Sequence, residues 1–107
     1  MVFREWRGRA TPSNAEAYPA HFRTRVLPEL RRVPGFLGAH LSKRQLDDKI
    51  EFLVLTRWHS IDSIRGFVGS SDITKAVVEP EAAAVLVDFD ASVQHYEIIE
   101  EEQSPAL

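Results

Sequence analysis

The chain has 107 residues, enough for one domain that buries about two-thirds of the surface its unfolded chain would expose. Its apolar and charged fractions of 44% and 27% are typical of a globular protein and exclude a disordered, collagen-like or coiled-coil chain. The absence of cysteine excludes disulfides, thiolate metal sites and a cysteine nucleophile, and the net charge of −3 argues against general nucleic-acid binding.

The first residues, MVFREWRGR, carry charges throughout, so we expect no secretory signal peptide. The apolar runs are too short to cross a bilayer, which predicts a cytoplasmic protein without a membrane partner. Basic residues exceed acidic ones through His59, and acidic residues exceed basic ones from Ser60 onward. We interpret this asymmetry as surface charge that pairs within the fold; a basic patch for an anionic ligand is the alternative.

The first expected element is a strand over residues 2–10, which Thr11-Pro12 ends. Ser13 and Glu16 fit a capping box at the start of a helical region of residues 13–32. Pro19 and Pro28 predict that this region is bent or interrupted, because each proline lacks a backbone N–H and crowds the preceding turn. Its apolar residues recur at steps of three and four and predict one core-facing stripe: Ala15, Tyr18, Phe22, Val26 and Leu30.

The next pair of expected strands covers residues 36–44 and 50–58, joined at Asp47-Asp48 as a hairpin. Ser60 is a plausible N-cap for a short helix that Gly69 ends. We then expect a second helical piece over residues 70–77 and a third that opens at Pro80. Residues 88–90 lead into a last strand over residues 92–99.

This order of elements, β-α-β-β-α-β, predicts an α+β domain of the ferredoxin-like class, an antiparallel sheet with its helices on one face. We expect the domain to span residues 1–99 and an acidic, flexible tail to follow at residues 100–107.

The expected strands carry apolar residues at both even and odd positions, so we expect apolar side chains on both faces of the sheet. Leu53 and Leu55 oppose the parity of Phe52 and Val54, and Phe36 opposes that of Leu41. The chain holds too little helix to cover two apolar faces, and a monomer rarely leaves such a patch in water. We therefore expect a homodimer in which two copies pack sheet against sheet.

Three segments resemble the antibiotic biosynthesis monooxygenase (ABM) domain of the dimeric α/β-barrel superfamily: PGFLGAHLSKR at 34–44, EFLVLTRWHSIDSIRGF at 51–67 and VQHYEII at 93–99. The resemblance implies a ferredoxin-like fold, sheet-to-sheet dimers and a ligand cavity between the sheet and the helices of each protomer. It also implies several activities, because the family includes cofactor-independent oxygenases of phenolic polyketides and haem-degrading enzymes.

The haem-degrading branch of that family uses an Asn, a Trp and a haem-ligating His. Aligned on this resemblance, those positions hold Trp6, Phe67 and Val78 here, so haem degradation is not expected. We expect no cofactor. We also expect no metal site, because His21, His40, His59 and His95 do not have metal-ligand spacing.

A cofactor-free oxygenase needs a dry cavity, a base or hydrogen bond that favours the substrate anion, and a fixed orientation. Candidate catalytic residues are His40, His95 and Tyr18, and Arg4, Arg7 or Arg57 are candidates for steadying the anion. Expected substrate contacts are Trp6, Arg4, Arg57, Phe67 and Phe22. Core packing is the alternative for Trp6 and Tyr18, pairing with an acidic neighbour is the alternative for Arg57, and Trp58 is expected to pack in the core.

Three functional classes remain open on the sequence. The first is a cofactor-independent monooxygenase acting on a small aromatic or polyketide-like phenol. The second is a non-catalytic dimer of the same fold that binds a small ligand. The third is another reaction on this scaffold, such as an isomerisation or a decarboxylation, because one fold supports unrelated activities.

Overall fold

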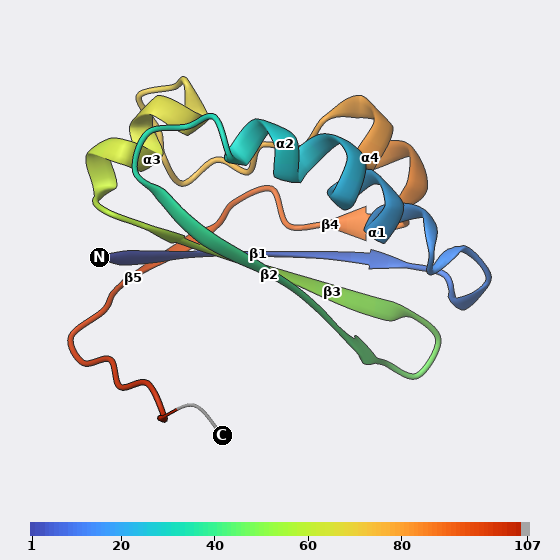
Figure 1. The fold of residues 1–107 in the computed structure, drawn as a ribbon. Helices are drawn as coiled ribbons and strands as arrows, with labels where there is room; N and C mark the ends of the chain where they lie inside the picture. Colours follow the sequence, from blue (N-terminus) through green and yellow to red (C-terminus); the bar gives the residue numbers. More distant parts are fainter. Residues whose placement is uncertain (106–107) are drawn as a thin grey trace.

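The computed structural model describes residues 1–105 as a twisted sheet with all of its helices on one face (Figure 1). The strands are β1 (Val2–Ala10), β2 (Phe36–Gln45), β3 (Ile50–Trp58), β4 (Asp88–Phe89) and β5 (Gln94–Glu97). They pair antiparallel in the order β2-β3-β1-β4, with β5 also on β1. The predicted α+β, ferredoxin-like fold is confirmed.

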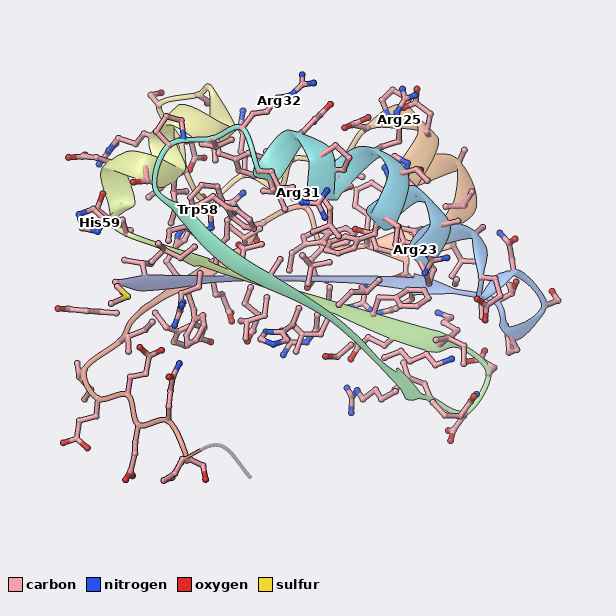
Figure 2. All side chains as sticks on the ribbon, in the orientation of Figure 1. Arg23, Arg25, Arg31, Arg32, Trp58 and His59 are labelled. Atoms are coloured by element: carbon pink, nitrogen blue, oxygen red, sulfur yellow. The ribbon has the colours of Figure 1, made fainter. Side chains whose placement is uncertain are left out.

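The core lies between the sheet and the helical layer. Along β1, buried and half-buried residues alternate without exception, as expected for a strand covered more fully on one face. The register places Trp58 opposite Val2, and Phe52 opposite Gly8. Figure 2 shows Trp58 between the sheet and the helices, where it is fully buried, so its predicted packing role is confirmed.

The first helical region is interrupted, as its prolines predict. It comprises a 3-10 turn η1 (Pro12–Asn14), α1 (Ala17–His21), a widened π-helical turn η2 (Phe22–Val26) and α2 (Leu27–Leu30). The widened turn ends two residues before Pro28, which lacks the N–H that a regular helix would direct at the Thr24 carbonyl. The predicted core stripe is confirmed, because Tyr18, Phe22 and Leu30 are buried while Ala15 and Val26 pack against them.

The predicted capping box is wrong. Ser13 lies inside the 3-10 turn, its hydroxyl lies 3.3 Å from that of Thr11, and no side chain caps the start of α1 at Glu16. The Ser60 cap is confirmed. Its side chain accepts a hydrogen bond from the Ser63 N–H at 3.2 Å, and α3 (Ile61–Val68) ends at Gly69, which has φ +67°.

The expected helix over residues 70–77 does not form. The Asp72 carboxylate accepts the Thr74 N–H at 3.0 Å, and the Lys75 N–H donates to the Asp72 carbonyl at 3.3 Å. The residues therefore form a turn, after which Lys75 bridges to Ser92. The helix at Pro80 is confirmed as α4 (Pro80–Val85). Residues 88–90, expected only as the approach to the last strand, contain strand β4, and the last strand, β5, is shorter than the expected 92–99.

A bulge in β2 changes the predicted facing of Phe36. The register slips between Phe36 and Gly38, so Phe36 pairs with Trp58 while Leu41 pairs with Val54. Both side chains therefore face the helices, and the Phe36 and Trp58 rings meet edge to face with centroids 5.4 Å apart. A bulged residue adds one position to its strand, which alternation along the sequence does not reveal.

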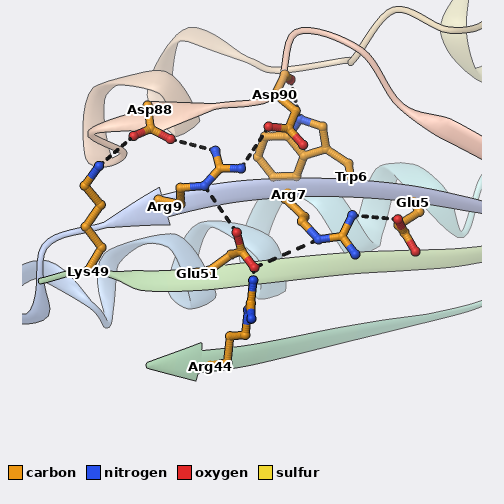
Figure 3. A network of polar contacts seen from close by, with 9 residues as sticks. All are labelled: Glu5, Trp6, Arg7, Arg9, Arg44, Lys49, Glu51, Asp88 and Asp90. Atoms are coloured by element: carbon orange, nitrogen blue, oxygen red, sulfur yellow. Dashed lines mark hydrogen bonds and ion pairs between the residues drawn. The ribbon is translucent and has the colours of Figure 1, made fainter. Parts of the chain in front are cut away.

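The open face of the sheet is not the continuous apolar surface that we expected. Leu53, Leu55 and Phe3 lie half-buried on it, but beside them a network of charges surrounds Glu51 (Figure 3). The Nε atoms of Arg44 and Arg9 lie 2.7 and 3.2 Å from its carboxylate. The hydrogen bond from Arg44 is the main cause that lowers the pKa of Glu51. Pairing within the sheet allows these charges to face away from the helices.

Charges also pair between the two halves of the chain. Arg9 contacts Asp88 at 2.6 Å and Asp90 at 2.9 Å, and Arg57 contacts Glu101 at 2.8 Å. These contacts show that part of the asymmetric charge pairs within the fold, and they confirm that Arg57 pairs with an acidic neighbour. Residues 106–107 of the expected tail lie outside the described residues. None of the helices in residues 1–105 is both long and apolar enough to span a membrane.

Candidate functional site

A cavity of about 70 Å³ lies between the sheet and the helical layer. Strands β1 and β3 provide its floor, and the first helical region, α3, α4 and the segment of residues 77–79 provide its walls and roof. Aromatic and aliphatic side chains dominate its lining, together with a few polar groups, as in most small-molecule sites.

Trp6 is a fixed wall of this cavity. Its indole N–H donates to the Asp90 carbonyl at 2.8 Å, which holds the ring in place. The ring lies over Gly8, where a Cβ atom would come within 2.8 Å of the indole. Tyr18 and Phe89 flank it at centroid distances of 5.8 and 6.2 Å. A flat face held in this way can stack on an aromatic ligand.

Tyr18 lines the cavity from α1 and stands at the centre of an aromatic cluster. Its ring lies 5.5 Å from Phe52 and 6.4 Å from Phe22. Burial raises the pKa of Tyr18 well above its ordinary value of 10.0. The hydroxyl therefore stays protonated at neutral pH, where it can donate a hydrogen bond but cannot serve as a base.

Arg4 brings a positive charge to the cavity wall. It is 5% exposed, and burial lowers its pKa to about 10, so the guanidinium remains charged at neutral pH. Its Nη1 donates to the Ile73 carbonyl at 2.7 Å, and its Nη2 donates to the Lys75 carbonyl at 2.8 Å. The guanidinium carbon lies 5.8 Å from the centre of the Phe67 ring, a cation–π contact.

His95 lies beside Arg4, outside the cavity lining. Its Nε2 is 2.9 Å from Arg4 Nη1. Burial, and then the charge of Arg4, lower the pKa of His95 below its ordinary 6.5, so the imidazole is neutral at neutral pH. Because an arginine has only donors, Nε2 must be the acceptor of this bond. Its lone pair is thus already engaged, which leaves His95 poorly placed to take a proton from a ligand.

His21 is a cavity residue that the sequence did not single out. It lies one helical turn after Tyr18, with ring centroids 6.0 Å apart, and it lines the cavity. Its Nε2 is buried without a hydrogen-bond partner among the described residues. The helical spacing of three residues from Tyr18 was the available signal, but a histidine beside a predicted core stripe has no pattern that marks it as functional.

The predicted site residues separate into two groups. Arg4, Trp6, Tyr18 and Phe67 line one cavity, and Phe22 packs behind Tyr18. His40 and Arg57 lie elsewhere: the register aligns them with Leu55 and Phe3, on the open face. Arg7 shares that face and binds Glu5 at 2.6 Å. The sheet therefore separates these residues from the cavity.

The three positions that the resemblance aligns with haem-degrading residues, Trp6, Phe67 and Val78, all line the cavity. Their side chains do not fit a haem-degrading site, because Val78 offers no iron ligand. Within residues 1–105, no three His, Asp or Glu side chains are grouped closely enough to hold a metal ion.

Comparison with known proteins gives one family. The model of the antibiotic biosynthesis monooxygenase family matches residues 1–79. No curated protein sequence matches the chain.

Solved structures share its fold at low identity. A Bacillus cereus protein named as a candidate antibiotic biosynthesis monooxygenase is 12% identical, with 96% of this chain and 97% of that one covered and a TM-score of 0.69. The haem degrader MhuD of Mycobacterium tuberculosis, with two haems in its active site, is 20% identical, with 96% of this chain and 100% of that one covered and a TM-score of 0.64. SnoaB, a cofactor-independent oxygenase of Streptomyces nogalater, is 18% identical over 94% of both chains, with a TM-score of 0.60.

Proposed function

The chain belongs to the antibiotic biosynthesis monooxygenase family, and we propose that it is a cofactor-independent monooxygenase of a small aromatic or polyketide-like phenol. One observation carries the proposal: a cavity between sheet and helices has aromatic walls and one buried cation, Arg4. The structural likeness to SnoaB, named as a cofactor-independent oxygenase, supports it at the level of the fold.

The proposed reaction uses the reactivity of an electron-rich substrate. Loss of a proton from the phenol or its keto form gives an anion that transfers electrons to oxygen. A ring CH₂ group and O₂ then give a carbonyl and water, so that one oxygen atom enters the product and the other leaves as water. The protein contributes a dry space, an orientation and stabilisation of the anion.

The cavity residues take distinct parts in this proposal. Trp6 and Phe67 hold the flat ring, Arg4 stabilises the anion, and the Tyr18 hydroxyl donates a hydrogen bond to the substrate oxygen. His95 remains a candidate through its bond to Arg4. His40 and Arg57 can take part only from the open face, where the partner chain of a dimer would meet them.

An oxygen electrode tests this proposal. Purified protein freed of metal is supplied with a series of quinols and anthrone-like phenols, and we expect oxygen uptake above that of heat-denatured protein. Tyr18→Phe and His95→Asn should each lower the rate about tenfold or more, within the range of a lost catalytic hydrogen bond. His59→Asn, an exposed histidine outside the cavity, is the matched control and should leave the rate unchanged. Full turnover in His40, His95 and Tyr18 variants alike would contradict the assignment.

A non-catalytic ligand-binding protein is the second candidate, and a specific observation favours it. Tyr18 stays protonated and the His95 lone pair is engaged, so neither is a ready base. Binding of phenols that quench tryptophan fluorescence, without any oxygen uptake across the series, would support this function in place of the oxygenase.

We also propose that two copies pair through the open faces of their sheets. Leu53, Leu55 and Phe3 provide apolar contact, and the charges around Glu51 provide polar contact at one end of the face. In this arrangement residues 1–99 form the domain, and residues 100–107 are an acidic tail anchored by Glu101 to Arg57.

A further inference from the structure

Three arginines on β1 differ in how their charge is balanced. Arg7 and Arg9 point to the open face and lie 2.6 Å from the carboxylates of Glu5 and Asp88. Arg4 points to the cavity and makes no ion pair within residues 1–105, although it is the most deeply buried of the three. Its acceptors are two backbone carbonyls and an imidazole, all uncharged.

A buried charge without a counter-ion is costly, because neutral acceptors replace only part of its lost hydration. His95 cannot supply the missing negative charge, and its low pKa keeps it from adding a second positive one. The two carboxylates that line the cavity, Glu29 and Glu79, both lie beyond ion-pair distance of Arg4. Glu29 is exposed and therefore lies at the mouth.

We infer that Arg4 is the anion-binding group of this cavity, and that the ligand it selects is an aromatic compound with one negative charge, a phenolate or a carboxylate. Its flat body packs between Trp6 and Phe67, and its charged end points inward to Arg4, away from Glu29 at the mouth. His95 is a positioning residue, which orients the guanidinium through Nη1. The inference rests on the proposal that the cavity is the ligand site, and not on the oxygen chemistry.

The volume of the cavity adds a requirement. About 70 Å³ is less than half of the roughly 150 Å³ that holds a benzene molecule in an engineered cavity, so a wall must move to admit a ring. The hydrogen bonds from Arg4 to Ile73 and Lys75 hold the segment that leads into wall residues 77–79 against β1. A ligand anion competes for those same donors, so binding at Arg4 also loosens the segment that leads into this wall.

The probe for the first test is 4-nitrophenol, whose phenolate is coloured and whose ionisation can be followed while it is bound. We expect the protein to lower the apparent pKa of the bound probe by at least about one unit, which corresponds to a tenfold preference for the anion. Arg4→Gln should abolish this shift, Arg4→Lys should retain part of it, and Arg7→Gln, the same change on the opposite face of β1, should leave it intact.

Benzoate and its neutral analogue benzamide test the preference for a carboxylate separately from that for a phenolate. This comparison needs no variant of the protein. A preference of at least tenfold for benzoate, measured by calorimetry on the unmodified protein, supports the inference for carboxylates, and the nitrophenol shift supports it for phenolates. If benzamide binds, benzoate does not bind more tightly and the pKa of 4-nitrophenol does not shift, the inference is overturned, but the cavity is still a ligand site. Binding of none of the three probes overturns the cavity as a ligand site, and the proposed function with it.

Discussion

At the scale of single residues, strand parity decides the chemistry of each arginine. Arg7 and Arg9 carry the same side chain as Arg4 and lie on the same strand, yet the pleat directs them to the carboxylates of the open face. Arg4 lies an odd number of residues from both, so its side chain points to the opposite face of the sheet. There it lines the cavity and donates hydrogen bonds to backbone carbonyls and to His95. Whether a position along the strand is even or odd thus separates a paired surface charge from a buried, unpaired one.

The titration of His95 reports the contact with Arg4 directly. We expect NMR to place the pKa of His95 below 6.5, because burial and the nearby cation both disfavour its charged form. A histidine whose pKa is lowered in the folded state stabilises the fold above pH 6.5, and this contribution is lost as the pH falls below that value. Arg4→Gln should raise the pKa of His95 and reduce this loss, whereas Arg7→Gln should do neither. An unchanged His95 midpoint in Arg4→Gln would contradict the contact.

At the scale of secondary structure, local sequence signals predict a segment correctly where neighbouring residues satisfy its backbone hydrogen bonds. They fail where a side chain distant in the sequence satisfies those hydrogen bonds. The Ser60 cap and Pro80 start were predictable, because each depends on neighbouring residues. Residues 70–77 read as helical, but Arg4 takes the carbonyls of Ile73 and Lys75 from 69 and 71 positions away. That tertiary contact favours a single turn followed by non-helical chain, which local helical propensity does not anticipate.

Gly35 provides a test of the junction between α2, β2 and α3. It has φ +88°, and a Cβ atom there would overlap the Ser63 side chain at the start of α3. Gly35→Ala should lower the free energy of unfolding by about 1–3 kcal/mol from backbone strain alone, and by more from the overlap. Gly38→Ala, three residues later in β2 with open space around it, is the control and should change stability by less than about 1 kcal/mol. Urea unfolding measures both, and equal effects would contradict the role of Gly35.

At the scale of the whole molecule, the sheet is covered on one face only, and its open face combines apolar and charged residues. The ion pairs of Glu51 are formed within one chain, so they do not require a partner. Leu53, Leu55 and Phe3 remain half-buried and are the part of this face that gains most from a second copy.

Leu55→Lys tests the proposed dimer, since it places a charge at the centre of the open face. We expect light scattering at micromolar concentration to give twice the 12.1 kDa chain mass for the unmodified protein and one chain mass for the variant. Thr24→Lys adds the same charge to the outer surface of the helical layer and should leave the dimer intact. A monomeric unmodified protein would rule out the pairing.

The sequence by itself determined the order of the main helices and strands along the chain, the interrupted first helical region and the core stripe, because alternation, proline positions and helical spacing are local properties. It also identified Trp6, Tyr18, Arg4 and Phe67 as candidates. Only the tertiary structure decided that these four share a cavity, that His40 and Arg57 lie across the sheet from it, and that His21 joins them. The physical reason is that a site consists of contacts between distant segments, and the register, a bulge and the course of the non-helical segment of residues 70–79 set those contacts.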